Sequence, residues 1–160
     1  QLQMNAKATV SALKDNGILD GDRVAITGHS YGAFMVAHLL THTDLFKTGI
    51  ARSGAYNRTL TPFGFQNERR TFWKAQETYL KVSPFMNADR MKKPLLMIHG
   101  KDHTNSGTLP MQSESYFAAL KANGANARLV LLPNEGHGYA AYESVAHVLW
   151  EQISWLDQYL

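Results

Sequence analysis

The sequence predicts an α/β fold in which about four mostly parallel strands carry helices on both faces. Apolar segments of strand length alternate along the chain with segments of helical periodicity. Residues 95–98, LLMI, are apolar at every position, which is typical of a strand buried on both faces of a parallel sheet. Residues 28–32, GHSYG, lie where a strand is expected to end and a helix to begin.

The first part of the chain is expected to form a helix, a strand and a second helix. The first helix should cover residues 2–15 and end at Gly17, because glycine tolerates the left-handed conformation at a helix end. The apolar face of this helix holds Leu2, Ala6, Val10 and Leu13. After a turn at 20–22, a strand is expected at 23–27. Residues 31–40 are apolar nearly all round, so this helix is expected to be buried against the sheet.

The middle of the chain is expected to contain two strands that flank an irregular segment. The strands are predicted at 48–53 and 94–99, the second of which contains the apolar run LLMI. Residues 56–90 between them are rich in aromatic side chains but have no regular period. We therefore expect this segment to be irregular.

The last part of the chain is expected to form a helix, a strand and a final helix. The first of these helices covers 110–123 and ends at Gly124, and the strand covers 127–132. Apolar residues recur at helical spacing over 142–160, which predicts an amphipathic helix. They are Tyr142, Val145, Leu149, Ile153, Leu156 and Leu160.

The composition argues against several classes of function. The chain has 160 residues, which favours one domain with a sizeable core, and a net charge of only +3. No block of Lys and Arg indicates a nucleic-acid surface, and no apolar run approaches the roughly 18 residues of a membrane span. The absence of cysteine excludes disulfides and a cysteine nucleophile. We therefore expect neither a nucleic-acid partner nor a membrane partner.

The G-x-S-x-G pattern of residues 28–32 is typical of the nucleophile turn of α/β-hydrolases. A serine on such a sharp strand-to-helix turn needs small residues two positions before and after it, because the backbones crowd there. Gly28 and Gly32 meet this need, so Ser30 is the candidate nucleophile. The backbone N–H of Tyr31, at the start of the helix, is the candidate donor to an oxyanion.

A serine nucleophile also needs a base that takes its proton and an acid that orients the base. In α/β-hydrolases the order along the chain is Ser, acid, His, each on a loop after a strand. Asp102 follows the third expected strand and His137 follows the fourth. Because the carboxyl ends of parallel strands meet at one edge of the sheet, Ser30, Asp102 and His137 are the candidate catalytic triad. This chemistry implies no cofactor.

Longer segments of the chain resemble one peptidase family. Residues 28–35, GHSYGAFM, and 49–66, GIARSGAYNRTLTPFGFQ, closely resemble the prolyl-oligopeptidase superfamily, nearest its glutamyl endopeptidase branch. The likeness continues through residues 79–85, 98–100, 111–114 and 131–135. The resemblance therefore covers nearly the whole chain.

This resemblance implies a serine peptidase that acts on peptides or proteins through an acyl-enzyme and cuts after glutamate. It also implies that residues 1–160 are the carboxyl-terminal portion of the peptidase α/β-hydrolase domain, without the amino-terminal strands and the β-propeller. The strand at 23–27 would then be an exposed apolar edge, which favours self-association. The branch has exported bacterial members and chloroplast members, so the compartment stays open.

One departure from the family pattern concerns the catalytic acid. The family places this acid four residues after the histidine of the His-Gly pair, and counting from His99 this position is His103. Asp102 lies one residue earlier, and neighbours in extended backbone point in opposite directions. Asp102 is therefore expected to orient His137 only if the loop 101–106 rearranges.

A preference for glutamate requires a cation near the substrate side chain. Among the candidates Arg52, Arg58, Arg69 and Arg70, we favour Arg58 as the substrate-binding residue, because it leaves the carboxyl end of the second strand. The aromatic residues of 56–85 either wall a substrate pocket or pack a small core of their own.

Three other interpretations concern a metal, a binding module and an esterase. His38 and His42 have a helical spacing that can bind a divalent ion, but no glutamate base accompanies them, so we expect no functional metal. A catalytically impaired or inactive hydrolase remnant that serves as a binding module is an alternative, which His103 at the acid position favours. An esterase of the same fold is a second alternative, because the same triad cleaves esters.

Overall fold

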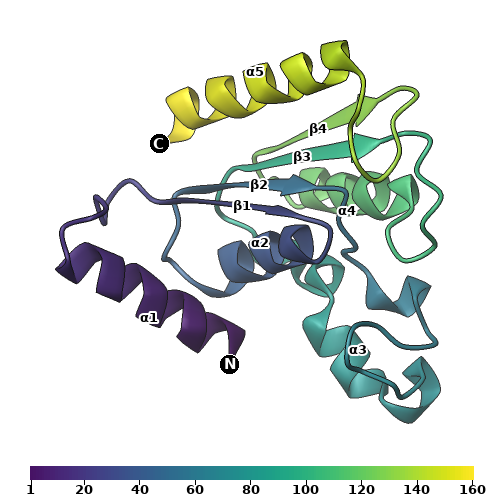
Figure 1. Cartoon of the computed structure of the whole chain (residues 1–160). Coiled ribbons are helices and arrows are strands. Elements are labelled where there is room, and N and C mark those ends of the chain that lie inside the picture. Colours follow the sequence, from purple (N-terminus) through teal and green to yellow (C-terminus); the bar gives the residue numbers. More distant parts are fainter.

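The chain forms a four-stranded parallel sheet in the order β1-β2-β3-β4 (Figure 1). The computed structural model describes all 160 residues. The strands are β1 (Ala25–His29), β2 (Thr48–Arg52), β3 (Leu95–Gly100) and β4 (Ala127–Leu132). The predicted α/β fold, with four parallel strands, is confirmed.

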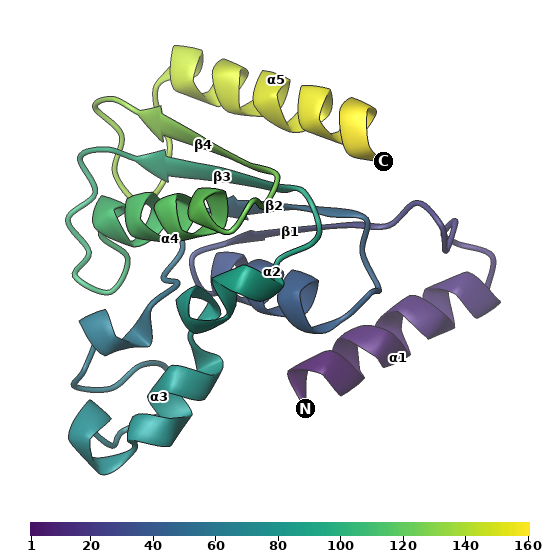
Figure 2. The same ribbon diagram turned by 180° about the vertical axis from the view of Figure 1, so that it is seen from behind.

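Helices cover both faces of the sheet, as predicted. Helices α2 (Tyr31–His42) and α4 (Pro110–Ala122) lie on one face, and α5 (Tyr142–Tyr159) lies on the other (Figure 1 and Figure 2). Helix α1 (Leu2–Asp15) packs beside α2. Its half-buried side chains are the four of the predicted apolar face, Leu2, Ala6, Val10 and Leu13.

The larger of two hydrophobic cores lies between the sheet and helices α2 and α4. Helix α2 contributes side chains on most of its circumference, which confirms that it is a buried helix. The smaller core joins the other face of the sheet to α5, with Ile50, Leu96 and Ile98 packed near Val148 and Trp155. Strand β3 is buried at every position, as its uninterrupted apolar run predicted.

The segment between β2 and β3 is more ordered than predicted. It contains 3₁₀ helices at Arg58–Leu60, Phe72–Lys74 and Pro84–Arg90, and a short helix α3 (Gln76–Val82). This insert lies below the carboxyl ends of the strands (Figure 1). Such short turns bury too few side chains to produce a repeating apolar pattern, so periodicity does not reveal them.

Two details of the predicted elements are wrong. Strand β1 begins and ends two residues later than expected, because its backbone stays paired with β2 as far as the pair His29 and Arg52. The final helix packs through a different face. Val148 and Trp155 are buried on the sheet, whereas most of the predicted apolar repeat, including Leu149 and Ile153, is exposed to solvent.

None of the helices combines the length and the apolar character that crossing a membrane requires.

Candidate active site

Ser30 lies at the sharp turn between the last residue of β1 and the first residue of α2. Its backbone has φ 58° and ψ −115°, a left-handed conformation that is strained for a residue with a side chain. The Ser30 N–H donates to the Arg52 carbonyl oxygen at 2.8 Å, which ties the turn to the end of β2. The strand-turn-helix context predicted for Ser30 is therefore present.

The two glycines of this turn have different roles. A Cβ on Gly28 would lie 2.3 Å from the backbone carbonyl carbon of Gly32, a distance that no real contact permits. A Cβ on Gly32 would meet nothing within 4 Å. Close packing therefore explains the glycine before Ser30, whereas no close contact requires a glycine at position 32.

The loops after β3 and β4 bring two imidazole rings, those of His103 and His137, to the same edge of the sheet as Ser30. The ring of His137 lies 4.7 Å from the ring of His29, the residue directly before Ser30. Nε2 of His103 and Nδ1 of His137 are joined by a hydrogen bond. None of the hydrogen bonds joins Ser30 to His137, and catalytic contacts of this kind often tighten only when substrate binds.

Asp102 does not occupy the position expected of the orienting acid. Its side chain is exposed, and its only hydrogen bond is made by its backbone N–H, which donates to the Glu135 carbonyl oxygen at 3.0 Å. The next side chain along the loop, that of the buried His103, points inward and contacts His137. The alternation of neighbouring side chains thus holds, and the loop rearrangement that would bring Asp102 to His137 is not seen.

Glu135 and Gly100, which the sequence interpretation missed, hold the His137 loop in place. The buried Glu135 carboxylate accepts the N–H groups of Ala140 and Ala141, both at 2.9 Å, and these bonds lower its pKa. A Cβ on Gly100 would lie 2.2 Å from the Gly136 carbonyl oxygen, so only glycine permits this approach of β3 to the loop. No periodic pattern signals either residue.

His99 fixes the loop that follows β3. Its ring is fully buried, with Nε2 2.8 Å from the Thr108 carbonyl oxygen and Nδ1 2.6 Å from Ser113 Oγ. Because a carbonyl only accepts, Nε2 carries the proton and Nδ1 accepts from the Ser113 hydroxyl. Burial, together with the neighbouring His103, lowers the pKa of His99 to about 4. A neutral histidine therefore fixes the end of the loop at Thr108.

A cavity of about 190 Å³ opens beside the nucleophile turn. It lies between the start of α2, the insert and the loop after β3, and its lining includes Ser30, Tyr31, Arg58, Phe65 and Thr108. As the first residue of α2, Tyr31 has no intrahelical partner for its backbone N–H. The cavity therefore combines a serine hydroxyl, the N-terminal end of a helix and one cation.

Arg58 is buried in this cavity without a counterion. Only 5% of its surface is exposed, it forms no ion pair, and its buried Nε has no hydrogen-bond partner. Its guanidinium carbon lies 4.9 Å from the ring centre of Phe34 and 4.8 Å from that of Phe65. Burial lowers its pKa. A buried cation held by aromatic rings and lacking a carboxylate is a ready site for an anion.

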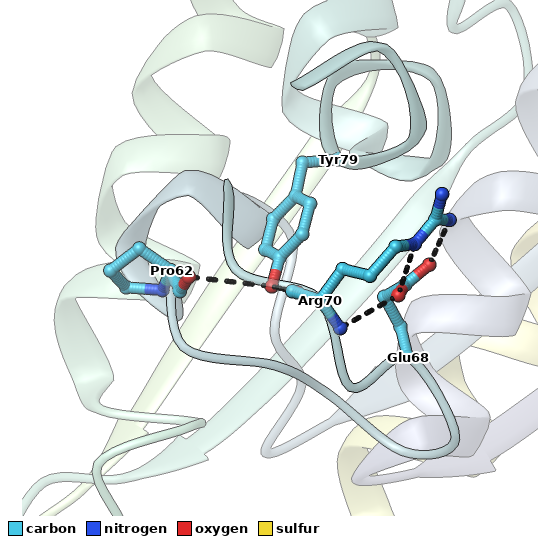
Figure 3. A network of polar contacts seen from close by, with 4 residues as sticks. All are labelled: Pro62, Glu68, Arg70 and Tyr79. Atoms are coloured by element: carbon cyan, nitrogen blue, oxygen red, sulfur yellow. Dashed lines mark hydrogen bonds and ion pairs between the residues drawn. The ribbon is translucent and has the colours of Figure 1, made fainter. Parts of the chain in front are cut away.

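The other candidate arginines are placed differently. Arg70 is exposed and forms a bidentate pair with Glu68, with Nε to Oε1 at 2.9 Å and Nη2 to Oε2 at 2.6 Å (Figure 3). The Tyr79 hydroxyl donates to the Arg70 carbonyl oxygen at 2.7 Å, which fastens the loop to α3 (Figure 3). Arg69 is exposed, and Arg52 lies outside the cavity lining.

The aromatic residues of the insert serve both purposes that the sequence left open. The rings of Phe65 and Phe72 pack edge-on against Tyr79, at 4.9 and 5.7 Å, and so form a small core. Phe65 also lines the cavity and covers Arg58. The insert therefore builds its own core and uses one ring of it as a cavity wall.

No three histidine or acidic side chains come together in a way that would hold a metal ion. The rings of His38 and His42 stack at 4.2 Å, and His42 Nδ1 lies 2.8 Å from the His38 carbonyl oxygen. This pair lies on α2, and neither residue lines the cavity.

Comparisons with known proteins give a family match and relatives of similar sequence. Residues 5–160 match the prolyl oligopeptidase family. The chain is 58% identical over 160 residues to the probable chloroplastic glutamyl endopeptidases of Arabidopsis thaliana and of Oryza sativa subsp. japonica. These alignments cover 99% of the chain but only 17% of each relative. The chain is also 30% identical over 164 residues to dipeptidyl-peptidase 5 of Porphyromonas gingivalis, covering 94% of the chain and 24% of the relative.

Solved structures show the same fold. A puromycin hydrolase matches with a TM-score of 0.84 at 23% identity, over 94% of this chain and 24% of that one. A puromycin-hydrolyzing peptidase of Mycobacterium tuberculosis matches with a TM-score of 0.82 at 25% identity, over 96% of this chain and 24% of that one. At this level of identity the likeness supports the fold of the chain.

Proposed function

The chain belongs to the prolyl oligopeptidase family of serine peptidases, and we propose that it carries the catalytic residues of an endopeptidase that cleaves peptide bonds after glutamate. The observation that carries the proposal is the buried, unpaired Arg58 in the cavity beside Ser30. A glutamate side chain in this cavity would supply the missing carboxylate. The names of the relatives that are 58% identical support the same specificity.

Ser30 and His137 are proposed to carry out the bond-breaking steps. The Ser30 hydroxyl attacks the carbonyl carbon of the peptide bond while its proton passes to Nε2 of His137. When the tetrahedral intermediate collapses, the C–N bond breaks and the proton on His137 moves to the leaving amine. Water then gives a proton to His137 and attacks the acyl-enzyme, and the proton returns to Ser30 as the acid product leaves.

The backbone N–H of Tyr31 is proposed to stabilise the oxyanion of the tetrahedral intermediate. Two features support this role: the N–H has no intrahelical partner, and the N-terminus of a helix favours negative charge. One such donor contributes roughly 10²–10³-fold to turnover in serine peptidases. Tyr31 lines the same cavity as Ser30.

Arg58 is proposed to select glutamate. The guanidinium would form a charge-assisted pair with the substrate carboxylate, which is stronger inside a cavity than at an exposed surface. Phe34 and Phe65 limit the positions that the guanidinium can adopt, so less conformational entropy is lost when the substrate binds. Glutamine, which has nearly the same shape but no charge, would leave the cation unpaired.

One observation favours the second candidate, a hydrolase remnant with impaired catalysis. The orienting position beside His137 holds the imidazole of His103 instead of a carboxylate. In the serine-protease triad the loss of the orienting carboxylate lowers turnover by about 10⁴. A binding module that captures glutamate-containing peptides at Arg58 without cleaving them would have this constellation.

Labelling of the serine with a fluorophosphonate separates these candidates. If the chain is a peptidase, the reagent will label Ser30, and the Ser30→Ala variant will stay unlabelled. Turnover of matched peptides with Glu or Gln before the cleaved bond, and of a simple acyl ester, then tests the specificity. A folded chain without labelling would favour the binding module, and labelling with turnover of the ester alone would favour an esterase.

A further inference from the structure

The hydrogen bonds of the loop after β3 determine which nitrogen of His103 carries a proton. The backbone N–H of Asn105 donates to Nδ1 of His103 at 3.2 Å. Because a donor faces it, Nδ1 of His103 must present its lone pair. A neutral imidazole has one N–H group, so the proton of His103 lies on Nε2, which points at Nδ1 of His137.

The Asn105 N–H is held in this direction by the turn around it. The Asn105 side-chain oxygen accepts the Gly107 N–H at 2.9 Å, and the Asn105 carbonyl oxygen accepts the Thr108 N–H at 3.0 Å. Thr108 is in turn fixed by the buried His99. Turning the donor away from His103 would therefore break several hydrogen bonds of one loop.

We infer that His103 is a positioning residue that holds His137 in the tautomer with its proton on Nε2. The N–H at Nε2 of His103 donates to Nδ1 of His137, so Nδ1 of His137 must be the acceptor. The single proton of a neutral His137 is then left on Nε2. If His137 donated through Nδ1 instead, Nε2 of His103 would have to accept, and the proton of His103 would lie on Nδ1. That N–H would then face the backbone N–H of Asn105, so two donors would oppose each other.

The surroundings of His103 favour its neutral form. Its side chain is buried, and burial together with the neighbouring His137 lowers its pKa. The groups that face it are the rings of His99 and His137 and the hydroxyl of Thr108, whose Oγ1 lies 3.1 Å from Nε2. His29 and Arg52 lie further along the same edge and add positive charge when protonated. No carboxylate contacts His103.

This tautomer opposes the reaction proposed for Ser30, and the kinetic part of the inference rests on that proposed function. A general base must present a lone pair at Nε2, whereas here Nε2 of His137 carries a proton. An orienting carboxylate produces the reverse arrangement, because it accepts the proton of Nδ1. His103 therefore lowers the fraction of His137 that is competent as a base, instead of replacing the acid.

The tautomer can be measured directly in the 160-residue chain by ¹⁵N NMR. Long-range correlations from the ring carbons' protons separate protonated from unprotonated nitrogens. At about pH 8.5, well above the ordinary histidine pKa of about 6.5, we expect His137 to be protonated at Nε2 and His103 likewise. In His103→Asp we expect the His137 proton to move to Nδ1. Asp102→Asn, one residue away and without side-chain hydrogen bonds, should leave the tautomer of His137 unchanged.

The rate of fluorophosphonate labelling supplies the kinetic readout. We expect His103→Asp to label Ser30 at least tenfold faster than the parent chain, toward the roughly 10⁴-fold effect of an orienting carboxylate. A parent chain in which His137 carries its proton on Nδ1 overturns the inference, as does a folded His103→Asp variant with an unchanged tautomer. If that variant does not fold, the spectrum of the parent chain decides alone. A tautomer that moves without any labelling contradicts the proposed function and leaves the positioning role intact.

Discussion

The guanidinium carbon of Arg58 lies 4.8 Å from the ring centre of Phe65, so an aromatic side chain from the insert covers the one buried cation of the cavity. Phe34 of α2 approaches the same guanidinium at 4.9 Å. Two elements far apart in the sequence thus restrain one side chain beside Ser30. A cation restrained in this way and left without a counterion can pair with an anionic group, which is the basis of the proposed preference for glutamate.

Arg58→Gln is predicted to remove the preference for glutamate. Losing one partner of a buried charge pair costs about 2–5 kcal/mol, so we expect kcat/KM for a Glu peptide to fall at least 30-fold. The matched Gln peptide should change less than about threefold, since it never formed the pair. Arg70→Gln is the control, because Arg70 is exposed and bound to Glu68. Equal losses for both peptides in Arg58→Gln would show that Arg58 supports the fold instead of the specificity.

The glycines at the nucleophile turn are predicted to differ in their tolerance of alanine. A Cβ on Gly28 would collide with the backbone of Gly32 at 2.3 Å, so Gly28→Ala should lower the free energy of unfolding by about 1–3 kcal/mol or more. A Cβ on Gly32 has open space and lies in a helix, where alanine is favoured by about 1 kcal/mol. Urea denaturation of the two variants measures this difference. Equal destabilisation would contradict the geometry of the turn.

The periodicity of apolar residues predicted the elements that bury a single regular stripe of apolar side chains. The four half-buried residues of α1 recur at helical spacing, and the apolar run of β3 has no polar interruption. The face of α5 was not predictable in this way, because the helix carries two apolar stripes. The stripe that packs is selected by distant partners: the Trp155 indole N–H donates to Thr48 Oγ1 at 2.7 Å, and Arg128 Nη2 donates to Glu151 Oε1 at 2.6 Å.

The candidate site was predictable where chain order and spacing carry the information. The strand-turn-helix context located Ser30, and the position after β4 located the loop of His137. The four-residue spacing that the family resemblance implies, counted from His99, pointed to His103, which is the residue that contacts His137. The surroundings of Arg58 could not be predicted from the sequence, because they depend on how a non-periodic insert folds back over α2.

Stability is predicted to fall as the solution is acidified from about pH 6.5 to about pH 4. Burial lowers the pKa of His99 to about 4 and that of His38 to about 4, below the ordinary value of 6.5. Between these pH values the two histidines bind protons in the unfolded chain but stay largely neutral in the folded chain, so acidification favours unfolding. At about pH 5 the cost from the fully buried His99 is about 2 kcal/mol. Urea midpoints at about pH 7.5 and pH 5 measure it.

His99→Gln separates this contribution from other acid effects. The amide can still donate to the Thr108 carbonyl oxygen and accept from Ser113, but it does not titrate. The variant should therefore show a weaker dependence of stability on pH above about pH 5, where few carboxylates have begun to protonate. An unchanged dependence would mean that the His99 ring is not held neutral by burial.

Self-association is predicted to occur through the free edge of β1. This strand pairs only with β2, so its outer backbone groups are open to another chain, and the exposed Thr27 lies at its centre. A lysine at an edge strand discourages such pairing, so Thr27→Lys should shift a concentration series in light scattering toward the monomer. The exposed stripe of α5 offers a competing surface, and Leu149→Lys disrupts it without touching the sheet. Association that survives Thr27→Lys but is lost in Leu149→Lys would assign the contact to the helix, and a parent chain that remains monomeric would exclude both surfaces.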